Sequence, residues 1–269
     1  MKILEKKIIA PNVHEMTVDA PDIAKKALPG QFVIAIPDEF SERTPITLSD
    51  WDTEKGTVTV VFLEIGAATK GLADLKAGDE IYSFTGPLGM PFEIEKFGRV
   101  GLVGGCYGIG GILQAAKALR EAGNEVISFS EARSQFLLYW NEKLEEVSDE
   151  VRYSTSDGSK GSKGHSHDLL EENLKDGEKF DRIMAVGCTF MMYRVGQITR
   201  PFNVKTIVSM NPIMIDGTGM CGACRLSIGG ETKFACVDGP HFDAHEVDWD
   251  VVLARRKAYL EEEIISKER

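Results

Sequence analysis

The residue pattern changes once along this chain, near Arg99, and that change limits the possible folds more than any other feature. Before it, short runs rich in β-branched and aromatic residues, such as Phe32–Ile36 and Thr57–Leu63, alternate with turns built from glycine and proline. Short strands with frequent turns are typical of small antiparallel barrels. The sequence therefore predicts a small antiparallel β-barrel over residues 1–97.

After this point, strand-like runs alternate with helical stretches. Residues 99–103 and 125–130 have the composition of buried strands, and residues 113–123 between them have a helical pattern. This order of strand, helix and strand predicts a mainly parallel, doubly wound α/β sheet, which we place over residues 98–212.

The remaining segments are shorter and less regular. Residues 213–247 contain three cysteines and little regular pattern, whereas residues 248–269 have the acidic start and charged end of a terminal helix. A loop rich in glycine and serine covers residues 154–164, and we expect the nearby His165 and His167 to be solvated.

The composition supports two folded domains and excludes several classes of function. The chain has 269 residues, of which 43% are apolar, enough for well-formed cores. Its formal net charge of -11 disfavours nucleic-acid binding, which depends on basic residues. No apolar stretch approaches the roughly 18 residues of a membrane span, so we expect a cytoplasmic protein. Five cysteines are an odd number for a disulfide framework.

Four potential metal ligands lie close together near the C-terminus. Asp216 and Cys221 are separated by four residues, Cys221 and Cys224 by two, and Cys236 follows after eleven more. This spacing matches the plant-type ferredoxin site for a 2Fe-2S cluster, except that aspartate replaces the first cysteine. Because such clusters carry single electrons, the segment predicts an electron-transfer protein.

Structural zinc is the alternative for the same cysteines. Zinc sites are usually built from cysteine and histidine, and His241 and His245 lie near enough in the sequence to complete one. The spacing of the first three ligands favours iron–sulfur, because it wraps one loop around a single cluster.

A glycine-rich turn lies at the expected junction of a strand and a helix. Five of the eight residues from Gly104 to Gly111 are glycine, and each costs roughly 1 kcal/mol relative to alanine within a helix. A backbone that approaches a pyrophosphate at a helix N-terminus explains this density, and a tightly packed turn is the alternative. Glu131 and Arg133 follow the second strand, so the choice between NAD and NADP stays open.

The predicted barrel contains a second candidate for ligand binding, between Arg43 and Thr47. One cation and two hydroxyl groups lie within five positions there. An arginine pairs well with phosphate oxygens, and a threonine hydroxyl can contact the edge of a flavin ring. A solvated turn is the alternative.

The order of these motifs resembles the ferredoxin–NADP reductase superfamily. Residues 29–32, 43–47, 64–71 and 86–89 come first, and the glycine-rich turn follows. With the cysteine segment after the nucleotide domain, the resemblance narrows to electron-transfer subunits related to that of dihydroorotate dehydrogenase. Those subunits have cysteine at all four ligand positions. With aspartate at the first ligand position, Asp216, the chain instead resembles the small subunits of NADH-dependent reduced ferredoxin:NADP oxidoreductases, also described as sulfide dehydrogenase subunits.

The resemblance implies that the chain binds FAD, NAD(H) and a 2Fe-2S cluster held by the four ligands named above. FAD would contact Arg43, Thr44, Pro45, Ile46, Thr47, Leu63, Glu64, Ile65, Thr69 and Lys70. NAD(H) would contact Gly105, Tyr107, Gly108, Ile109, Gly110, Ala132, Arg133, Ser134, Asp157, Gly187, Cys188 and Met191. Thr47, at the flavin ring, and Cys188, which would position the nicotinamide, are the catalytic candidates. A buried thiol at a strand end is the alternative for Cys188.

The resemblance also implies a route for electrons, between nicotinamide, FAD, cluster and a partner. The partner is expected to be a larger flavin and iron–sulfur subunit that handles NADP(H) and ferredoxin, in a heterodimer. Three alternatives stay open: an electron-transfer subunit of a dihydroorotate dehydrogenase or of a sulfide- or sulfite-type reductase, a redox-sensing module without turnover, and a zinc-stabilised nucleotide-binding regulatory protein. No nucleic-acid or membrane partner is expected.

Overall fold

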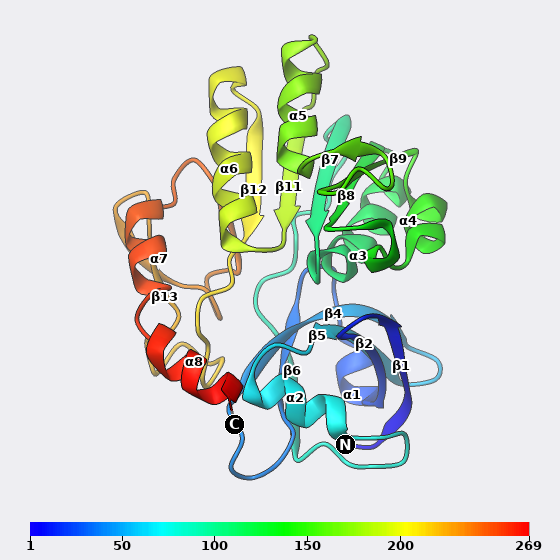
Figure 1. The fold of residues 1–269 in the computed structure, drawn as a ribbon, viewed down its shortest axis with the longest axis vertical. Helices are drawn as coiled ribbons and strands as arrows, with labels where there is room; N and C mark the ends of the chain where they lie inside the picture. The colour runs from blue at the N-terminus through cyan, green and yellow to red at the C-terminus, as the bar shows by residue number, and fades with distance from the viewer. Residues whose placement is uncertain (269) are drawn as a thin grey trace. The chain divides into compact units, whose positions relative to one another are not determined.

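The computed structural model describes residues 1–268, which divide into two compact units (Figure 1). The barrel unit contains residues 1–91, residues 212–240 and the described residues from Asp248 onward. The sheet unit contains residues 92–211 and 241–247. Each unit is therefore assembled from separate stretches of the chain.

Six antiparallel strands form the sheet of the barrel unit, in the order β1-β2-β5-β4-β3-β6. They are β1 (Ile3–Ala10), β2 (Val13–Asp19), β3 (Phe32–Ile36), β4 (Thr44–Asp52), β5 (Thr57–Leu63) and β6 (Ser83–Leu88), with the short helices α1 (Pro21–Ala24) and α2 (Ala67–Asp74) between them. Lys2 forms a bridge with Glu80, which links the start of β1 to the segment before β6. This arrangement confirms the predicted antiparallel barrel.

Alternating side chains of these strands fill the core. Met16 of β2 lies opposite Val60 of β5, and Val18 lies opposite Val58. All four side chains are at most 1% exposed. Since side chains alternate between the two faces of a strand, the same β-branched runs that predict strands from sequence also supply the cross-strand pairs that stabilise the sheet.

The sheet unit contains a seven-stranded sheet in the order β10-β9-β8-β7-β11-β12-β15. Its strands are β7 (Arg99–Gly105), β8 (Glu125–Ala132), β9 (Glu150–Thr155), β10 (Ser162–Lys163), β11 (Arg182–Val186), β12 (Lys205–Ser209) and β15 (His241–Asp243). Its helices are α3 (Gly108–Glu121), η1 (Gln135–Leu137), α4 (Asn141–Val147), α5 (Ser166–Lys175), α6 (Thr189–Thr199) and η2 (Arg200–Phe202). All pairings are parallel except that of β12 with β15, so the predicted doubly wound sheet is confirmed.

The direction of winding reverses at β7. From there the chain moves outward through β8 to β9, and it later returns to the other side of β7 with β11 and β12. Right-handed crossovers then place α3 and α4 on one face and α5 and α6 on the other. Ligands of open α/β sheets bind at such a reversal, beside the carboxyl ends of the strands. In this sheet, that position is the end of β7 and β11.

The cysteine segment is more regular than its sequence indicates. Strands β13 (Arg225–Ile228) and β14 (Glu231–Phe234) form a hairpin in the barrel unit. Gly229 and Gly230 have φ values of 58° and 82°, as a two-residue hairpin turn requires. The hairpin and β15 leave little trace in the sequence, because strands of three or four mostly polar residues give a weak pattern.

Two helices, α7 (Trp249–Arg255) and α8 (Leu260–Glu268), replace the single terminal helix predicted for residues 248–269. Between them, the N–H groups of Lys257 and Ala258 bond to carbonyls three residues earlier, which interrupts the α-helical pattern. Within residues 1–268, no helix combines the length and the apolar character needed to cross a membrane.

Candidate functional site

The β13–β14 hairpin brings Cys224 and Cys236 together. The Ala235 N–H donates to the Cys224 carbonyl at 3.2 Å at the open end of this hairpin. Both thiols are buried, and their Sγ atoms lie 3.3 Å apart. Burial and then the neighbouring thiol raise the pKa of Cys236 to about 12. Two thiolates on one tetrahedral metal, at bonds of about 2.3 Å, would lie roughly 3.7 Å apart, so this pair fits as two ligands of one ion.

Asp216 and Cys221 lie side by side on the preceding loop. Asp216 Oδ1 accepts the N–H of Thr218 at 2.9 Å, and Oδ2 accepts the N–H of Cys221 at 3.0 Å. These hydrogen bonds, that from Thr218 foremost, lower the pKa of the Asp216 carboxyl. Gly217 and Gly219, with φ values of 74° and 81°, supply the left-handed backbone that lets the loop fold back.

The loop and the hairpin meet at Cys236. The Gly219 N–H bonds to the Cys236 sulfur, and the charge of Asp216 acts on the same thiol. The structure therefore gathers Asp216 and the three cysteines into one segment of the barrel unit. Their donor set, one carboxylate and three thiols, suits an iron–sulfur cluster.

The two histidines considered for zinc have other partners within the sheet unit. The His241 ring stacks on Phe92 with a centroid separation of 3.7 Å. His245 Nε2 lies 3.0 Å from the Thr199 hydroxyl oxygen. These contacts favour a cluster over a zinc site completed by histidine.

Strand β4 begins with four predicted flavin contacts, Thr44, Pro45, Ile46 and Thr47. Ile46 is 5% exposed and packs in the barrel core, so only its backbone can contact a ligand. Pro45 and Thr47, on the other face, are partly exposed. Arg43 is exposed, with Nη1 donating to the Ile215 carbonyl at 3.4 Å. This places the guanidinium group beside the start of the cysteine loop.

Thr69 shapes the loop that leads into α2. Its Oγ1 accepts the N–H groups of Ile65 and Gly66, both at 3.0 Å, and donates to the Gly66 carbonyl at 3.1 Å. The hydroxyl is therefore used within the loop. The first turn of α2 contains no acidic residue, so its free N–H groups and positive dipole end suit a phosphate.

Three further predicted flavin contacts, Leu63, Glu64 and Lys70, differ in whether the side chain already has a partner within the protein. The Glu64 carboxylate lies 3.1 Å from Nε2 of His14, a histidine that is 4% exposed. Leu63 and Lys70 are partly exposed. Of these side chains, Glu64 is already engaged within the barrel unit, whereas Leu63 and Lys70 remain predicted contacts.

Gly108 lies where β7 passes into α3, against the end of β11. A Cβ atom at Gly108 would lie 1.9 Å from the carbonyl oxygen of Val186, so only glycine fits. The first turn of α3 lacks an acidic residue. The turn is thus tightly packed, and the start of α3 also has the character of an anion site. The contacts confirm the tightly packed turn, and pyrophosphate binding stays a prediction.

Tyr139 supports the glycine-rich turn, although the sequence does not point to it. Its buried hydroxyl accepts the N–H of Gly110 at 3.0 Å and lies 3.1 Å from the Cys106 carbonyl oxygen, to which it can donate. Burial raises the pKa of Tyr139, so this hydroxyl stays protonated at neutral pH. The predicted contact at Gly110 therefore has its N–H engaged by the protein.

Asn211 and Thr189 fix the neighbouring end of β11. Asn211 Nδ2 donates to the Tyr107 hydroxyl at 2.7 Å, and that hydroxyl donates to the Gly187 carbonyl at 3.0 Å. The Thr189 hydroxyl donates to Asn211 Oδ1 at 2.9 Å. Nothing in the local sequence signals this network, because its members are far apart along the chain.

Cys106 and Cys188 lie at the carboxyl ends of adjacent strands. Gly104 pairs with Val186 in the β7–β11 register, and each cysteine follows two residues later. Both thiols are exposed, so the alternative of a buried Cys188 was wrong. The reason is that Cys188 leaves the strand to cap α6, where its Sγ accepts the N–H of Met191 at 3.4 Å.

The residues predicted near the nucleotide ribose are tied to a following loop. Asp157 Oδ1 accepts the N–H and hydroxyl of Ser159 at 2.9 and 2.6 Å. These bonds, with one from Ser134, lower the pKa of Asp157 to about 2. The Asp157 N–H donates to the Arg133 carbonyl at 3.1 Å. Ala132 is 4% exposed, so only its backbone can contact a nucleotide.

Glu131 is engaged by the start of α5. Its Oε2 accepts the N–H and hydroxyl of Ser166 at 2.9 and 2.6 Å, and Oε1 lies 2.7 Å from His165 Nδ1. The Glu131 carboxylate thus has three partners within the protein, whereas the sequence offered it as an acceptor for a ribose hydroxyl. His165 is exposed as expected, but the prediction of a solvated His167 was wrong, because α5 begins at Ser166 and buries that ring.

Comparisons with known proteins agree with the resemblance that the motifs indicate. Residues 211–248 match the family described as the iron–sulfur cluster binding domain of dihydroorotate dehydrogenase B. The chain is 45% identical to the dihydroorotate dehydrogenase B (NAD(+)) electron transfer subunit homolog of Thermotoga maritima, covering 100% of this chain and 94% of that relative.

Solved structures give the same picture. A chain of the NADH-dependent reduced ferredoxin-NADP oxidoreductase, studied for flavin-based electron bifurcation, is similar with a TM-score of 0.94 and 44% identity, covering 100% of this chain and 96% of that one. A ferredoxin NADP+ reductase from Neisseria gonorrhoeae, with bound FAD and NADP, has a TM-score of 0.61 at 17% identity, over 75% of this chain and 90% of that one. The second likeness shows the fold alone.

Proposed function

Because the chain belongs to the family of dihydroorotate dehydrogenase B electron-transfer subunits and their homologues, we propose that it passes electrons between NAD(H) and a larger partner subunit, through FAD and a 2Fe-2S cluster. The observation that carries the proposal is the pair of buried sulfurs of Cys224 and Cys236, 3.3 Å apart beside the loop of Asp216 and Cys221. A bound flavin supplies the exchange between a hydride and single electrons.

The residues of the sheet unit have the character needed to hold the nucleotide. The start of α3 offers N–H groups and a positive dipole end to the pyrophosphate, and the missing side chain at Gly108 lets the turn pack against β11. Cys188 caps α6 at the carboxyl end of β11, beside the proposed nicotinamide position. Its exposed thiol is available to contact and orient the ring.

The barrel unit offers a matching set of groups for FAD. Arg43 presents an exposed guanidinium group for the pyrophosphate, and Thr47 presents a hydroxyl for the ring edge. Thr69 holds the loop before α2 in the shape that presents the N–H groups of that helix. We assign these roles to the chain's own residues, with Thr47 closest to the reacting part of the flavin.

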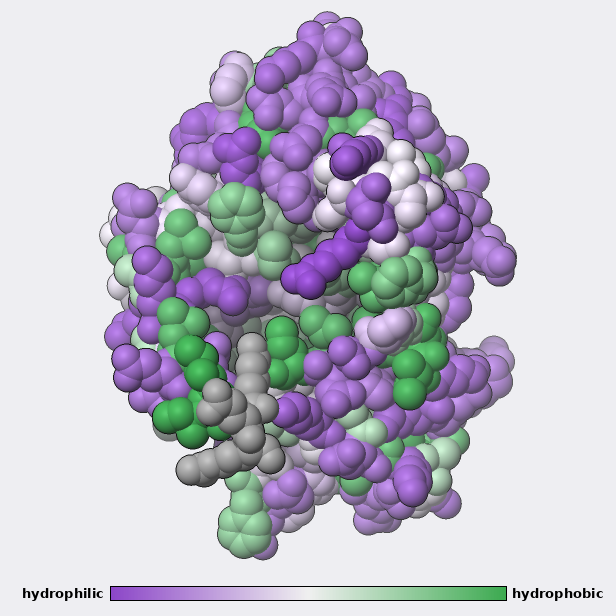
Figure 2. Space-filling view, viewed as in Figure 1, coloured by the Kyte–Doolittle hydropathy of each residue, from purple (hydrophilic) through white to green (hydrophobic). Residues whose placement is uncertain are grey.

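Exposed apolar side chains support a protein partner. Ile213, Ile215, Met220 and Val237, all in the cysteine segment, are between 39% and 88% exposed. Figure 2 also shows apolar side chains over α8, where Leu260, Ile264 and Ile265 are exposed. Apolar surface of this kind marks interaction sites. The proposed partner is a larger flavin and iron–sulfur subunit that handles NADP(H) and ferredoxin, with the cluster segment facing it.

An anaerobic titration with NADH tests the proposed function. We expect the purified protein, with its cofactors, to contain FAD, iron and acid-labile sulfide, and NADH to bleach both the flavin and the cluster absorption. A colourless protein containing zinc and no sulfide would contradict the proposal. Cofactors that stay oxidised in NADH, with no reduction of artificial acceptors, would instead indicate a redox-sensing module. Purification of the native complex tests the partner separately.

Replacing Asp216 with cysteine tests the first cluster ligand. We expect iron and sulfide content to persist, while the electron paramagnetic resonance signal changes and the midpoint potential moves by on the order of 100 mV, because ligand type strongly affects cluster potential. Asp250→Cys, at an exposed position on α7, adds a thiol outside the loop and should leave both quantities unchanged. Unchanged content, spectrum and potential in Asp216→Cys would mean that Asp216 is not a ligand.

A further inference from the structure

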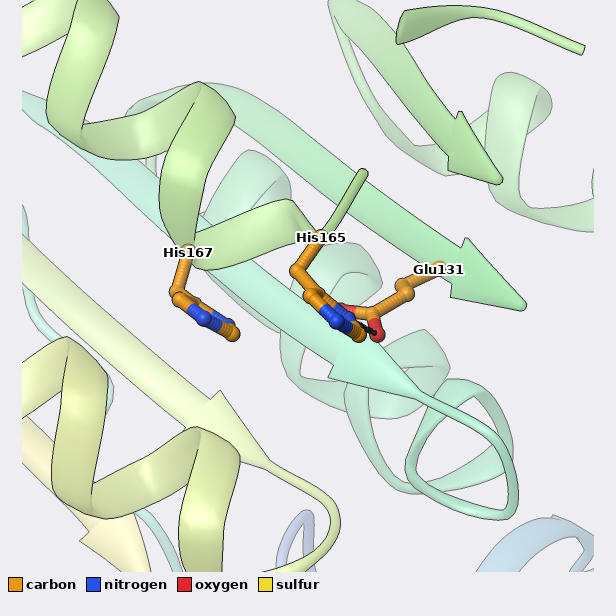
Figure 3. A group of neighbouring side chains, drawn as sticks. All are labelled: Glu131, His165 and His167. Atoms are coloured by element: carbon orange, nitrogen blue, oxygen red, sulfur yellow. Dashed lines mark hydrogen bonds and ion pairs between the residues drawn. The ribbon is translucent and has the colours of Figure 1, made fainter. Parts of the chain in front are cut away.

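Glu131, His165 and His167 form a cluster of metal-binding side chains outside the cysteine segment. Glu131 lies on β8, near its carboxyl end, while His165 and His167 flank the first residue of α5. One ligand atom from each residue lies within 4.8 Å of the others. Figure 3 shows the two rings side by side, with the Glu131 carboxylate against His165.

His167 carries an unexplained polar atom in this cluster. The residue as a whole is 5% exposed, and its Nδ1 has no hydrogen-bond partner among the described residues. Its other ring nitrogen, Nε2, lies 3.6 Å from the Asp168 carboxylate. Buried imidazole nitrogens are normally satisfied, so an unpartnered one beside a second histidine and a carboxylate points to a missing ligand.

The Glu131 carboxylate is held in place by hydrogen bonds, as metal-binding carboxylates usually are. Ser166 holds Oε2 through its N–H and its hydroxyl, at 2.9 and 2.6 Å. The other oxygen, Oε1, faces His165 Nδ1 at 2.7 Å. Hydrogen bonds that fix one carboxylate oxygen and direct the other are typical of the groups that surround metal sites.

The stacking and exposure of the two histidine rings indicate from which side an ion would reach this cluster. They are stacked, with centroids 5.0 Å apart and planes 8° from parallel, so one ring has to turn for both to face a single ion. The His165 side chain is 50% exposed, whereas that of His167 is 6% exposed. His165 is therefore the ring with solvent space in which to turn, and its exposed side is the entry path.

We propose that Glu131, His165 and His167 bind one divalent transition-metal ion, with zinc as the best match. Two imidazoles and one carboxylate form a ligand set that zinc uses, with water in the fourth position. Magnesium and calcium prefer sites built from oxygen atoms, so they fit less well. The bound ion joins the end of β8 to the start of α5, next to the residues 132–134 proposed for the ribose.

Equilibrium dialysis of the cofactor-loaded protein against micromolar zinc tests this site. The zinc and iron bound per chain are quantified by elemental mass spectrometry. We expect one zinc per chain and an unchanged iron content. His165→Ala and Glu131→Gln should each weaken zinc binding by at least about tenfold, as loss of a ligand or its support does at metal sites. His245→Gln is the control, because His245 contacts Thr199 outside this cluster, and it should bind zinc as the unmodified protein does.

The variants also separate this site from the thiols. Zinc binding that persists in His165→Ala and Glu131→Gln would place the ion elsewhere and overturn the proposal, as would zinc uptake matched by loss of iron. Absence of zinc binding to the unmodified protein would overturn it directly. Thermal unfolding with and without zinc gives a second measurement, because an ion bound to the folded state raises the unfolding temperature of the unmodified protein and not of His165→Ala.

Discussion

Replacing Cys224 with serine is expected to remove the iron–sulfur cluster. Cys224 is buried, and its sulfur lies 3.3 Å from that of Cys236, so both would bind the same ion. A serine hydroxyl is a poor substitute for a thiolate at iron. Iron and acid-labile sulfide should fall by more than about tenfold. Replacing even a residue that only supports a metal ligand can lower metal affinity by about tenfold or more, and Cys224 would be a ligand itself. Colorimetric iron and sulfide assays measure this directly.

The flavin supplies an internal reference for this variant. Because the flavin residues proposed on β4 and α2 do not include Cys224, flavin content should persist, and NADH should still bleach the flavin band. Cys188→Ser is the matched control, since Cys188 is an exposed thiol in the sheet unit and its loss should leave iron and sulfide unchanged. Full iron and sulfide content in Cys224→Ser would exclude Cys224 as a ligand.

Replacing Gly108 with alanine is expected to destabilise the sheet unit and prevent nucleotide binding. The new Cβ would lie 1.9 Å from the Val186 carbonyl oxygen and 3.0 Å from the Gly187 Cα. These are backbone atoms, so no flexible side chain can move aside, and the start of α3 must shift away from β11. We expect the free energy of unfolding to fall by about 3 kcal/mol or more, in the range of severe overpacking.

Two measurements check this prediction. Urea unfolding reports the change in stability, and NADH titration of the flavin absorption reports the loss of binding. Gly66→Ala is the control, because a Cβ at Gly66 would meet no heavy atom within 4 Å. As Gly66 precedes α2, its replacement should cost less than about 1 kcal/mol. Unfolding of Gly108→Ala at the same urea concentration as the unmodified protein would show that the contact relaxes easily.

Local patterns predict the two sheets because their causes are local. The run Thr57–Leu63 is β-branched throughout much of its length, and its alternate residues Val58 and Val60 fill the core. The glycine cluster likewise marks the turn from β7 into α3, although the contact that requires glycine at Gly108 comes from Val186 on β11. Side chains alternate between the two faces of a strand. This alternation also explains why the side chain of Ile46 points into the core, whereas those of its neighbours Pro45 and Thr47 lie on the other face.

The parts that the sequence leaves hidden depend on contacts between distant residues. Tyr139 reaches the glycine-rich turn from the segment that follows η1, and Asn211 reaches Tyr107 from beyond β12. The engagement of Glu131 by Ser166 is of the same kind. Each needs the folded sheet to bring its members together, so no spacing or composition signal exists for it. The residue assignments for FAD and nucleotide contacts remain proposals.

The discontinuous make-up of the two units bears on how the chain is made and how it can be cut. The chain passes from one unit to the other after residues 91, 211, 240 and 247. A ribosome therefore has to deliver nearly the entire chain before either unit is complete, because β15 and the cysteine hairpin both arrive late. A protease that cuts at one passage leaves the units joined through the other three. Neither unit can be obtained as an intact piece by trimming the chain from one end.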